Sequence, residues 1–335
     1  MSGVTVGDMS QVFAMRRQTY DIKTALERAS YEVTTGQTQD LAGAVGGDFA
    51  PIAAIDHARK ALASYAQSNA EATNFVSGVQ NALVGLENLS SDMGSSFLLV
   101  AQAQDDDRID VLASDAKGRF GSAVAILNTR FAGQSLFSGA ATDQTALNAP
   151  DVILEALKTE VAGLTSGTEI AARVTAWFEA DDGFSAVGYA GAQDGRAPLQ
   201  VGPNDQVDFS VTAQNSALRA HLAGYAMAAL MDEGILAGNP AARASLMASA
   251  GTAMLGADNK LAALRADVGG VEARLELAAT RIAAEDAGLQ TARDAIAAVD
   301  PYAAAAALQS TQTQLESLFA ITARLSRLNL TEFLR

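Results

Sequence analysis

The sequence of 335 residues contains no cysteine and only two histidines, His57 and His221. The absence of cysteine excludes disulfides, thiol nucleophiles, zinc knuckles and iron–sulfur clusters bound by thiolates. The two histidines are far apart in the sequence, and we expect both on helix surfaces or, for His221, at a helix cap. Imidazole chemistry is therefore nearly excluded.

Motifs for catalysis and ligand binding are also missing. No nucleophile elbow, zinc-protease helix, dinucleotide loop or EF-hand loop occurs. The glycine-rich segment 36–51 lacks the order of a phosphate-binding loop. Asp105, Asp106 and Asp107 are consecutive, and consecutive helical positions point about 100° apart, so they cannot converge on one metal ion. The sequence favours a protein without enzymatic activity, cofactor or metal; an enzyme would need a carboxylate-lined pocket in the middle of the chain.

Positive charge is scarce, because 23 Lys and Arg residues face 38 Asp and Glu residues and give a formal net charge of −15. This balance disfavours nucleic acid, whose phosphates need clustered cations, and anionic lipid surfaces. No uncharged apolar run approaches the roughly 20 residues that cross a bilayer. The N-terminus has no basic region followed by an apolar core. We therefore expect no nucleic acid, no membrane and no cleavable secretory signal.

What the chain does contain is apolar residues at heptad spacing near both ends. Steps of three and four residues alternate in segments 8–34 and 304–335, as in coiled coils. Thr19 and Thr322 interrupt these edges; such polar positions either fix the register or are merely tolerated. We call the two edges the terminal seams, and we expect them to pair with each other. Their positions are Val12, Met15, Ile22, Leu26, Val33, Leu308, Leu315, Leu318, Leu325 and Leu328.

Longer seams occupy the interior of the chain and predict a helical rod. One uninterrupted helix is expected from Pro51 to about Gln104, on the order of 75 Å long. A third helix is expected after the acidic triplet, with its apolar residues facing the core as far as Phe131. Another helix is expected over residues 256–299. The predicted rod core comprises Val76, Val79, Leu83, Leu86, Met93, Phe97, Leu112, Val124, Leu127, Leu264, Val268, Val271, Leu275 and Ile282.

Residues 148–251 differ from the rest, with short apolar clusters, several glycines and prolines, and the only tryptophan. Alternating apolar residues there indicate strands, and two flanking stretches indicate helices. Trp177 and Phe178 are expected in the core of this segment rather than on a ligand platform. The predicted elements are helices near 151–164 and 217–234, and strands at 187–189 and 207–211.

Together these patterns predict a mostly α protein. Both chain ends form a long antiparallel helical bundle or coiled-coil rod, and a small α+β domain is inserted in the middle. The predicted division has a terminal coiled-coil domain (1–45 with 300–335), a helical rod (46–147 with 252–299) and an inserted outer domain (148–251).

Three segments carry family features. Residues 13–37 read FAMRRQTYDIKTALERASYEVTTGQ, in which a glycine after two threonines closes the first helix. Residues 137–143 follow an F-x-G-x-x-T-D pattern, and residues 311–334 end in an aromatic–leucine pair, Phe333-Leu334. These segments resemble the flagellar hook–filament junction proteins, the third hook-associated proteins of the flagellin superfamily. Segments 37–40 and 45–48 depart from the sequences usual in flagellins at these places, and only 48–51 resembles the proline-containing stretch of junction proteins.

The resemblance implies a structural, extracellular subunit of the bacterial flagellum. Such proteins are exported unfolded by the flagellar type III system without a cleaved signal. They form a ring of about eleven subunits between the first hook-associated protein and flagellin. An export chaperone would hold the C-terminal helix, and the terminal seams would be the assembly interface.

Two alternatives remain open at this point. The chain could be a flagellin that polymerises into the filament itself. It could also be a soluble coiled-coil binding module, such as an adhesin, in which residues 8–34 and 304–330 are ordered in the monomer.

Overall fold

The computed structural model describes the backbone of residues 6–333, with side chains for Ser10 and residues 13–324. Long helices dominate this part of the chain, and its strands form two small antiparallel hairpins. The fold is therefore mostly α, with a small inserted segment, as predicted. The chain divides into two compact units, Met1–Leu62 with Ala284–Arg335 and Ala63–Ala283. The three-part division expected from the sequence stays a prediction.

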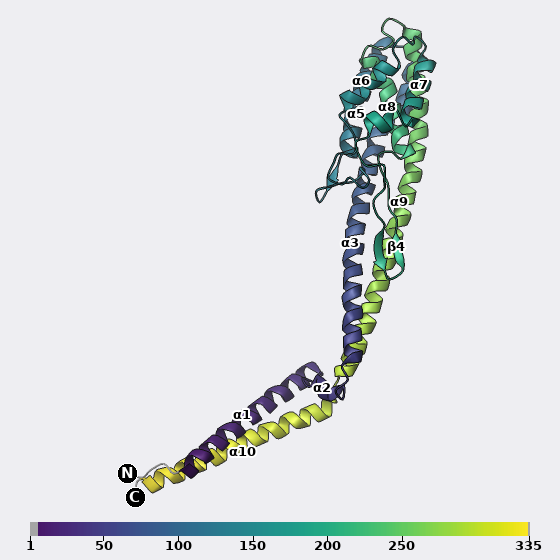
Figure 1. Ribbon diagram of the computed structural model, residues 1–335. Coiled ribbons are helices and arrows are strands. Elements are labelled where there is room, and N and C mark those ends of the chain that lie inside the picture. The colour runs from purple at the N-terminus through teal and green to yellow at the C-terminus, as the bar shows by residue number, and fades with distance from the viewer. Residues whose placement is uncertain (1–5, 334–335) are drawn as a thin grey trace. The chain divides into compact units, whose positions relative to one another are not determined.

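The smaller unit is organised around two helices from opposite ends of the chain. Helix α1 (Val6–Thr35) packs along α10 (Pro301–Phe333), as Figure 1 shows. Between α1 and the next long helix lies a connector that contains the single turn α2 (Leu41–Ala44). The beginning of α3 (Ala50–Ser90) and the end of α9 (Pro240–Ala297) complete this unit.

Helix α10 begins at a proline that follows a capping aspartate. Pro301 occupies its first position, where a missing N–H costs no hydrogen bond. The Asp300 carboxylate accepts the backbone N–H of Tyr302 at 2.8 Å and caps the new helix.

The larger unit contains the rest of α3, the remaining helices and both hairpins. Its helices are α4 (Met93–Ala103), α5 (Asp106–Leu127), α6 (Pro150–Glu160), α7 (Gly167–Glu179) and α8 (Ser216–Asp232), with a π-helical turn at Phe184–Gly188. Its hairpins pair β1 (Arg130–Phe131) with β2 (Gln134–Ser135), and β3 (Leu199–Gly202) with β4 (Asp205–Val207). Figure 1 shows α5, α6, α7 and α8 gathered beside α9.

The uninterrupted helix predicted for residues 51–104 is wrong, because the chain breaks at Ser91 and Asp92. Asp92 adopts a left-handed conformation with φ of 64°, and its carbonyl accepts the Ser95 hydroxyl. Serine and aspartate compete with the helix by bonding nearby backbone groups. The heptad spacing continues across this break, which is why the pattern concealed it.

The third helix also ends earlier than predicted, at Leu127 rather than Phe131. The Asn128 side chain exchanges two hydrogen bonds with the backbone of Leu147, accepting its N–H at 2.8 Å and donating to its carbonyl at 3.0 Å. These bonds hold the chain out of helical register. Phe131 therefore lies in strand β1 and is 43% exposed.

The inserted segment is more helical than its alternating residues suggested. Helix α7 was not predicted, and the strand expected at 187–189 is wrong. Phe184–Gly188 forms the π-helical turn, and Tyr189 makes only an isolated bridge to Leu147. The strand expected at 207–211 ends at Val207.

Aromatic packing explains the π-helical turn. Trp177, Phe178 and Phe184 form a cluster with ring centroids 5.2–6.3 Å apart, and all three are buried. Gly188 lies directly against the Phe184 ring, where a Cβ atom would approach it to 2.5 Å. Trp177 and Phe178 are therefore core residues, as the sequence indicated.

Helix α8 is the most buried helix of the larger unit. Every residue from Leu222 to Met231 is buried, and α8 packs on α5 and α7. A helix that is apolar all round belongs in a core. The expectation that His221 lies on a helix surface or cap is therefore wrong, since its side chain is completely buried in α8.

Ion pairs hold the C-terminal end of α8. Lys117 of α5 lies 2.6 Å from Glu233, and Lys158 of α6 lies 3.1 Å from the same carboxylate. Hydrogen bonds from these two ammonium groups lower the pKa of Glu233 below its ordinary value. The end of α8 is thus held by ion pairs to both α5 and α6, and all three helices contribute to one hydrophobic core.

Helices α4 and α9 cross at a pair of glycines. A Cβ atom on Gly251 would meet the Gly94 carbonyl oxygen and the Leu98 side chain at 2.8 Å. A Cβ atom on Gly94 would meet Leu255 at 2.9 Å. The absence of side chains lets the two backbones approach closely at this crossing.

We predict opposite effects for two alanine substitutions in α9. Gly251→Ala should lower the free energy of unfolding of the larger unit by about 1 kcal/mol, because overpacking costs about 1–3 kcal/mol and exceeds the helix-propensity gain. Gly270→Ala is the matched control, since nothing lies within 4 Å of its Cβ position, and it should raise that free energy by about 0.5–1 kcal/mol. Urea unfolding followed by Trp177 fluorescence measures both; equal shifts would contradict the close crossing.

Candidate assembly surface

The predicted rod core falls in the larger unit. Thirteen of its fourteen positions are buried, and Leu112 is half-buried against the core. The buried positions are Val76, Val79, Leu83, Leu86, Met93, Phe97, Val124, Leu127, Leu264, Val268, Val271, Leu275 and Ile282.

The terminal seams are covered far less. Leu318 is buried, but Val33 is 41% exposed. The side chains of Val12, Leu325 and Leu328 lie outside the described residues. Ala29 and Ala304, which follow the same heptad spacing as the seam positions, are the other well-buried residues among those described in the helix pair. The half-buried seam positions are Met15, Ile22, Leu26, Leu308 and Leu315.

Aromatic side chains outside the seams are exposed on the smaller unit. Phe13, Tyr20 and Tyr302 are 70%, 71% and 88% exposed. Tyr31, Phe49 and Phe319 are also exposed, whereas Phe131 is the one exposed aromatic residue among those described in the larger unit. Concentrated exposed apolar side chains are typical of protein interaction sites. Heptad counting missed these residues because they do not lie on the seam.

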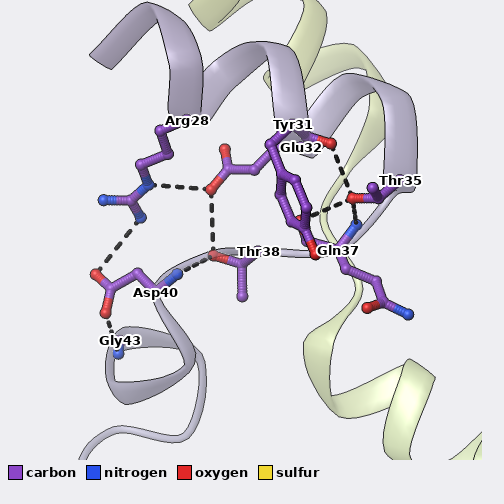
Figure 2. Close-up of polar contacts among 8 residues, drawn as sticks. All are labelled: Arg28, Tyr31, Glu32, Thr35, Gln37, Thr38, Asp40 and Gly43. Carbon is purple, nitrogen blue, oxygen red and sulfur yellow. Dashed lines mark hydrogen bonds and ion pairs between the residues drawn. The ribbon is translucent and has the colours of Figure 1, made fainter. Parts of the chain in front are cut away.

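A chain of polar contacts shapes the connector that follows α1 (Figure 2). Glu32 of α1 accepts hydrogen bonds from Arg28 at 3.1 Å and from the Thr38 hydroxyl at 3.2 Å. Thr38 in turn accepts the backbone N–H of Asp40, and Asp40 caps α2 by accepting the N–H of Gly43, both at 3.0 Å. Glu32 therefore links the last turn of α1 to the start of α2.

Backbone hydrogen bonds tie the connector to the junction between α9 and α10. Gly36 ends α1 in a left-handed conformation with φ of 70°, which favours glycine. Its carbonyl accepts the N–H of Val299 at 3.0 Å, and Thr38 donates to the carbonyl of Ala297 at 2.8 Å. The side-chain amide of Gln37 also donates a hydrogen bond to the Asp294 carboxylate at 2.8 Å. The entry to α10 and the exit from α1 are thus held together.

Two ion pairs join α3 and α9 within the same unit. Arg59 donates to Asp286 at 2.8 Å, and Arg293 donates to Asp56 at 3.1 Å. The hydrogen bond from Arg59 lowers the pKa of Asp286 below its ordinary value. These pairs fix the two helices next to the connector.

Neither a metal site nor a membrane span is evident in the described part of the chain. No group of three or more histidine, aspartate or glutamate side chains is arranged to hold a metal ion there. None of the helices described is both long and apolar enough to cross a membrane.

Residues 252–334, most of α9 and all of α10, match the family model of the bacterial flagellin C-terminal helical region. This region of the chain is flagellin-like. It contains the C-terminal seam and the rod positions from Leu264 to Ile282, so the matched region includes helices of both units.

A solved structure shares the fold. It belongs to a protein from Vibrio parahaemolyticus provisionally assigned as a flagellar hook-associated protein. The TM-score is 0.52 at 17% sequence identity, and the match covers 71% of this chain and 92% of that one. No protein with curated annotation matches the sequence significantly.

We predict that Glu32→Ala loosens the connector without affecting the larger unit. Loss of the two hydrogen bonds to Glu32 should speed amide exchange of residues 37–43 up to about fivefold, since partly exposed ionic contacts contribute about 0.2–1 kcal/mol. Glu27→Ala is the control, because the Glu27 carboxylate has no bonding partner among the described residues. Equal exchange in both variants would show that Glu32 does not order the connector.

Proposed function

We propose that this protein is a non-enzymatic structural subunit of the bacterial flagellum. The observation that carries the proposal is the flagellin-like region at residues 252–334, whose last helix pairs with α1 from the other end of the chain. The pair leaves aromatic residues exposed and its own seam half-covered. A surface of this kind is suited to burial between subunits.

Within this class we propose the hook–filament junction as the place of the protein. The N-terminal segment 13–37 and the turn at 137–143 resemble junction proteins, and the solved structure with the same fold is assigned to a hook-associated protein. The partners would be further copies in a ring of about eleven subunits, the first hook-associated protein and flagellin. The proposed location is extracellular.

The terminal seams and the exposed aromatic residues would form the assembly interface. In this scheme residues 1–45 with 300–335 form the assembly domain, 46–147 with 252–299 the rod, and 148–251 an outer domain. A helix whose apolar edge is uncovered gains much of its stability from packing against a partner. A chaperone that covers α10 would keep it from associating before export through the type III system, and the absence of cysteine avoids cross-links in transit.

We predict that Leu318→Asp blocks incorporation while leaving the larger unit folded. Leu318 is buried in the α1–α10 pair, so a carboxylate there loses its hydration. Ser317 is exposed, and a carboxylate at that position stays hydrated. In a strain lacking the chromosomal gene, Leu318→Asp should be secreted or retained with its chaperone, with hooks that carry no filament. Ser317→Asp introduces the same charge and should restore filaments. Normal filaments with Leu318→Asp would overturn the assembly role of the seam.

A flagellin that builds the filament is the second candidate, because the matched family model is that of flagellin itself. Purified protein seeded with filament fragments separates the two roles. A junction subunit should add to fragment ends without elongating them, whereas a flagellin should extend them into long fibres visible by electron microscopy. Elongation would contradict the junction role and would indicate a flagellin of the filament.

A further inference from the structure

Helix α8 carries a polar cluster inside the core. His221 is completely buried, and neither of its imidazole nitrogens has a hydrogen-bond partner among the described residues. One turn further along, the Tyr225 hydroxyl is also buried without a partner in the same part of the chain. The two rings meet edge to face, with centroids 5.2 Å apart. Such unpaired polar groups are costly and rarely kept without consequence.

Charged groups approach this cluster from three neighbouring helices. Asp258 of α9 lies 4.0 Å from His221 Nδ1, too far for a hydrogen bond, and instead accepts the Ser90 hydroxyl at 2.7 Å. Glu87 of α3 acts electrostatically on Asp258, and Asp115 and Arg119 of α5 act on Tyr225. The Glu87 carboxylate is paired with Arg265.

A neutral imidazole fits this environment and an imidazolium does not. An imidazolium needs two acceptors for its two N–H groups, and the described residues offer neither nitrogen a hydrogen bond. Burial lowers the pKa of His221 from 6.5 to about 4. Desolvation also raises the pKa of Asp258 and of Tyr225, which shifts each of these groups towards its uncharged form.

We propose that His221 is an acid-sensitive latch, which keeps α8 in the core while its imidazole is neutral and releases it when the imidazole is protonated. Release would separate α8 from α5, on which it packs. It would also separate α8 from α9, because Gly224 of α8 lies against Met254 of α9. The inserted segment would loosen first, because α8 is its central helix.

The direction of the pH dependence follows from the two pKa values. In the unfolded chain His221 binds a proton near pH 6.5, whereas in the folded chain it does so near pH 4. The stabilisation that comes from keeping His221 neutral is therefore complete above pH 6.5 and is lost as the pH falls towards 4. The whole loss lowers the folding equilibrium constant about 300-fold. Asp258 acts in the opposite direction, because it binds its proton more readily when folded, and it offsets part of the loss at the acid end.

The chain offers a matched control, because His57 is its only other histidine and is exposed on α3. We would compare the full-length untagged protein with His221→Phe and His57→Phe by urea unfolding. Fluorescence of Trp177, the only tryptophan, reports on the larger unit. Between about pH 7.5 and about pH 5, the unfolding constant of the wild type should rise about 30-fold more than that of His221→Phe. His57→Phe should follow the wild type.

Parallel pH curves for His221→Phe and the wild type would overturn the proposal. So would a wild type that gains relative stability in acid, because that result would mean an imidazolium paired with Asp258. If His221→Phe does not fold, the test is NMR of the imidazole protons of the wild type. The spectrum of His57→Phe lacks the His57 signal and therefore assigns the two histidines. The His221 signal should stay constant down to about pH 5, because burial lowers the pKa of His221 to about 4. A His221 midpoint near 6.5, the ordinary pKa of histidine, would exclude the latch.

These measurements use no flagellar readout. They therefore test the latch independently of the proposed function.

Discussion

The burial of long apolar helix edges is the constraint on which this structure depends. In the larger unit the constraint is met, because the apolar edges of α3, α5 and α9 and the residues of α8 share one continuous core. Some polar side chains inside that core, unlike His221 and Tyr225, reach a backbone acceptor. Asn69 of α3, for example, donates to the carbonyl of Leu275 in α9 at 2.9 Å.

The terminal helix pair meets the same constraint only in part. Two helices share one face, so α1 and α10 can bury Ala29, Ala304 and Leu318 but must leave their other sides to solvent. Residues such as Phe13 and Tyr302 on those sides are too apolar and too exposed to be explained by the pair alone. Further subunits would supply the missing cover, and this connects the incomplete packing with a role in assembly.

Complete burial has its own consequence in the larger unit. The His221 imidazole is completely buried in α8 and has no hydrogen-bond partner among the described residues, so burial disfavours its charged form. The interaction that gives this unit its stability at neutral pH thus makes it sensitive to acid. The connector of the smaller unit is organised differently, by partly exposed hydrogen bonds around Glu32.

The sequence by itself determined the helical class, the pairing of the two chain ends and most of the rod core, because heptad spacing survives in any packing that buries one edge of a helix. It also placed a boundary near residue 300, where α10 begins. Only the tertiary structure decided the break at Asp92, the π-helical turn before Tyr189 and the burial of His221. Each of these depends on contacts between residues distant in sequence or on competition between a local turn and a helix, and neither leaves a periodic signal.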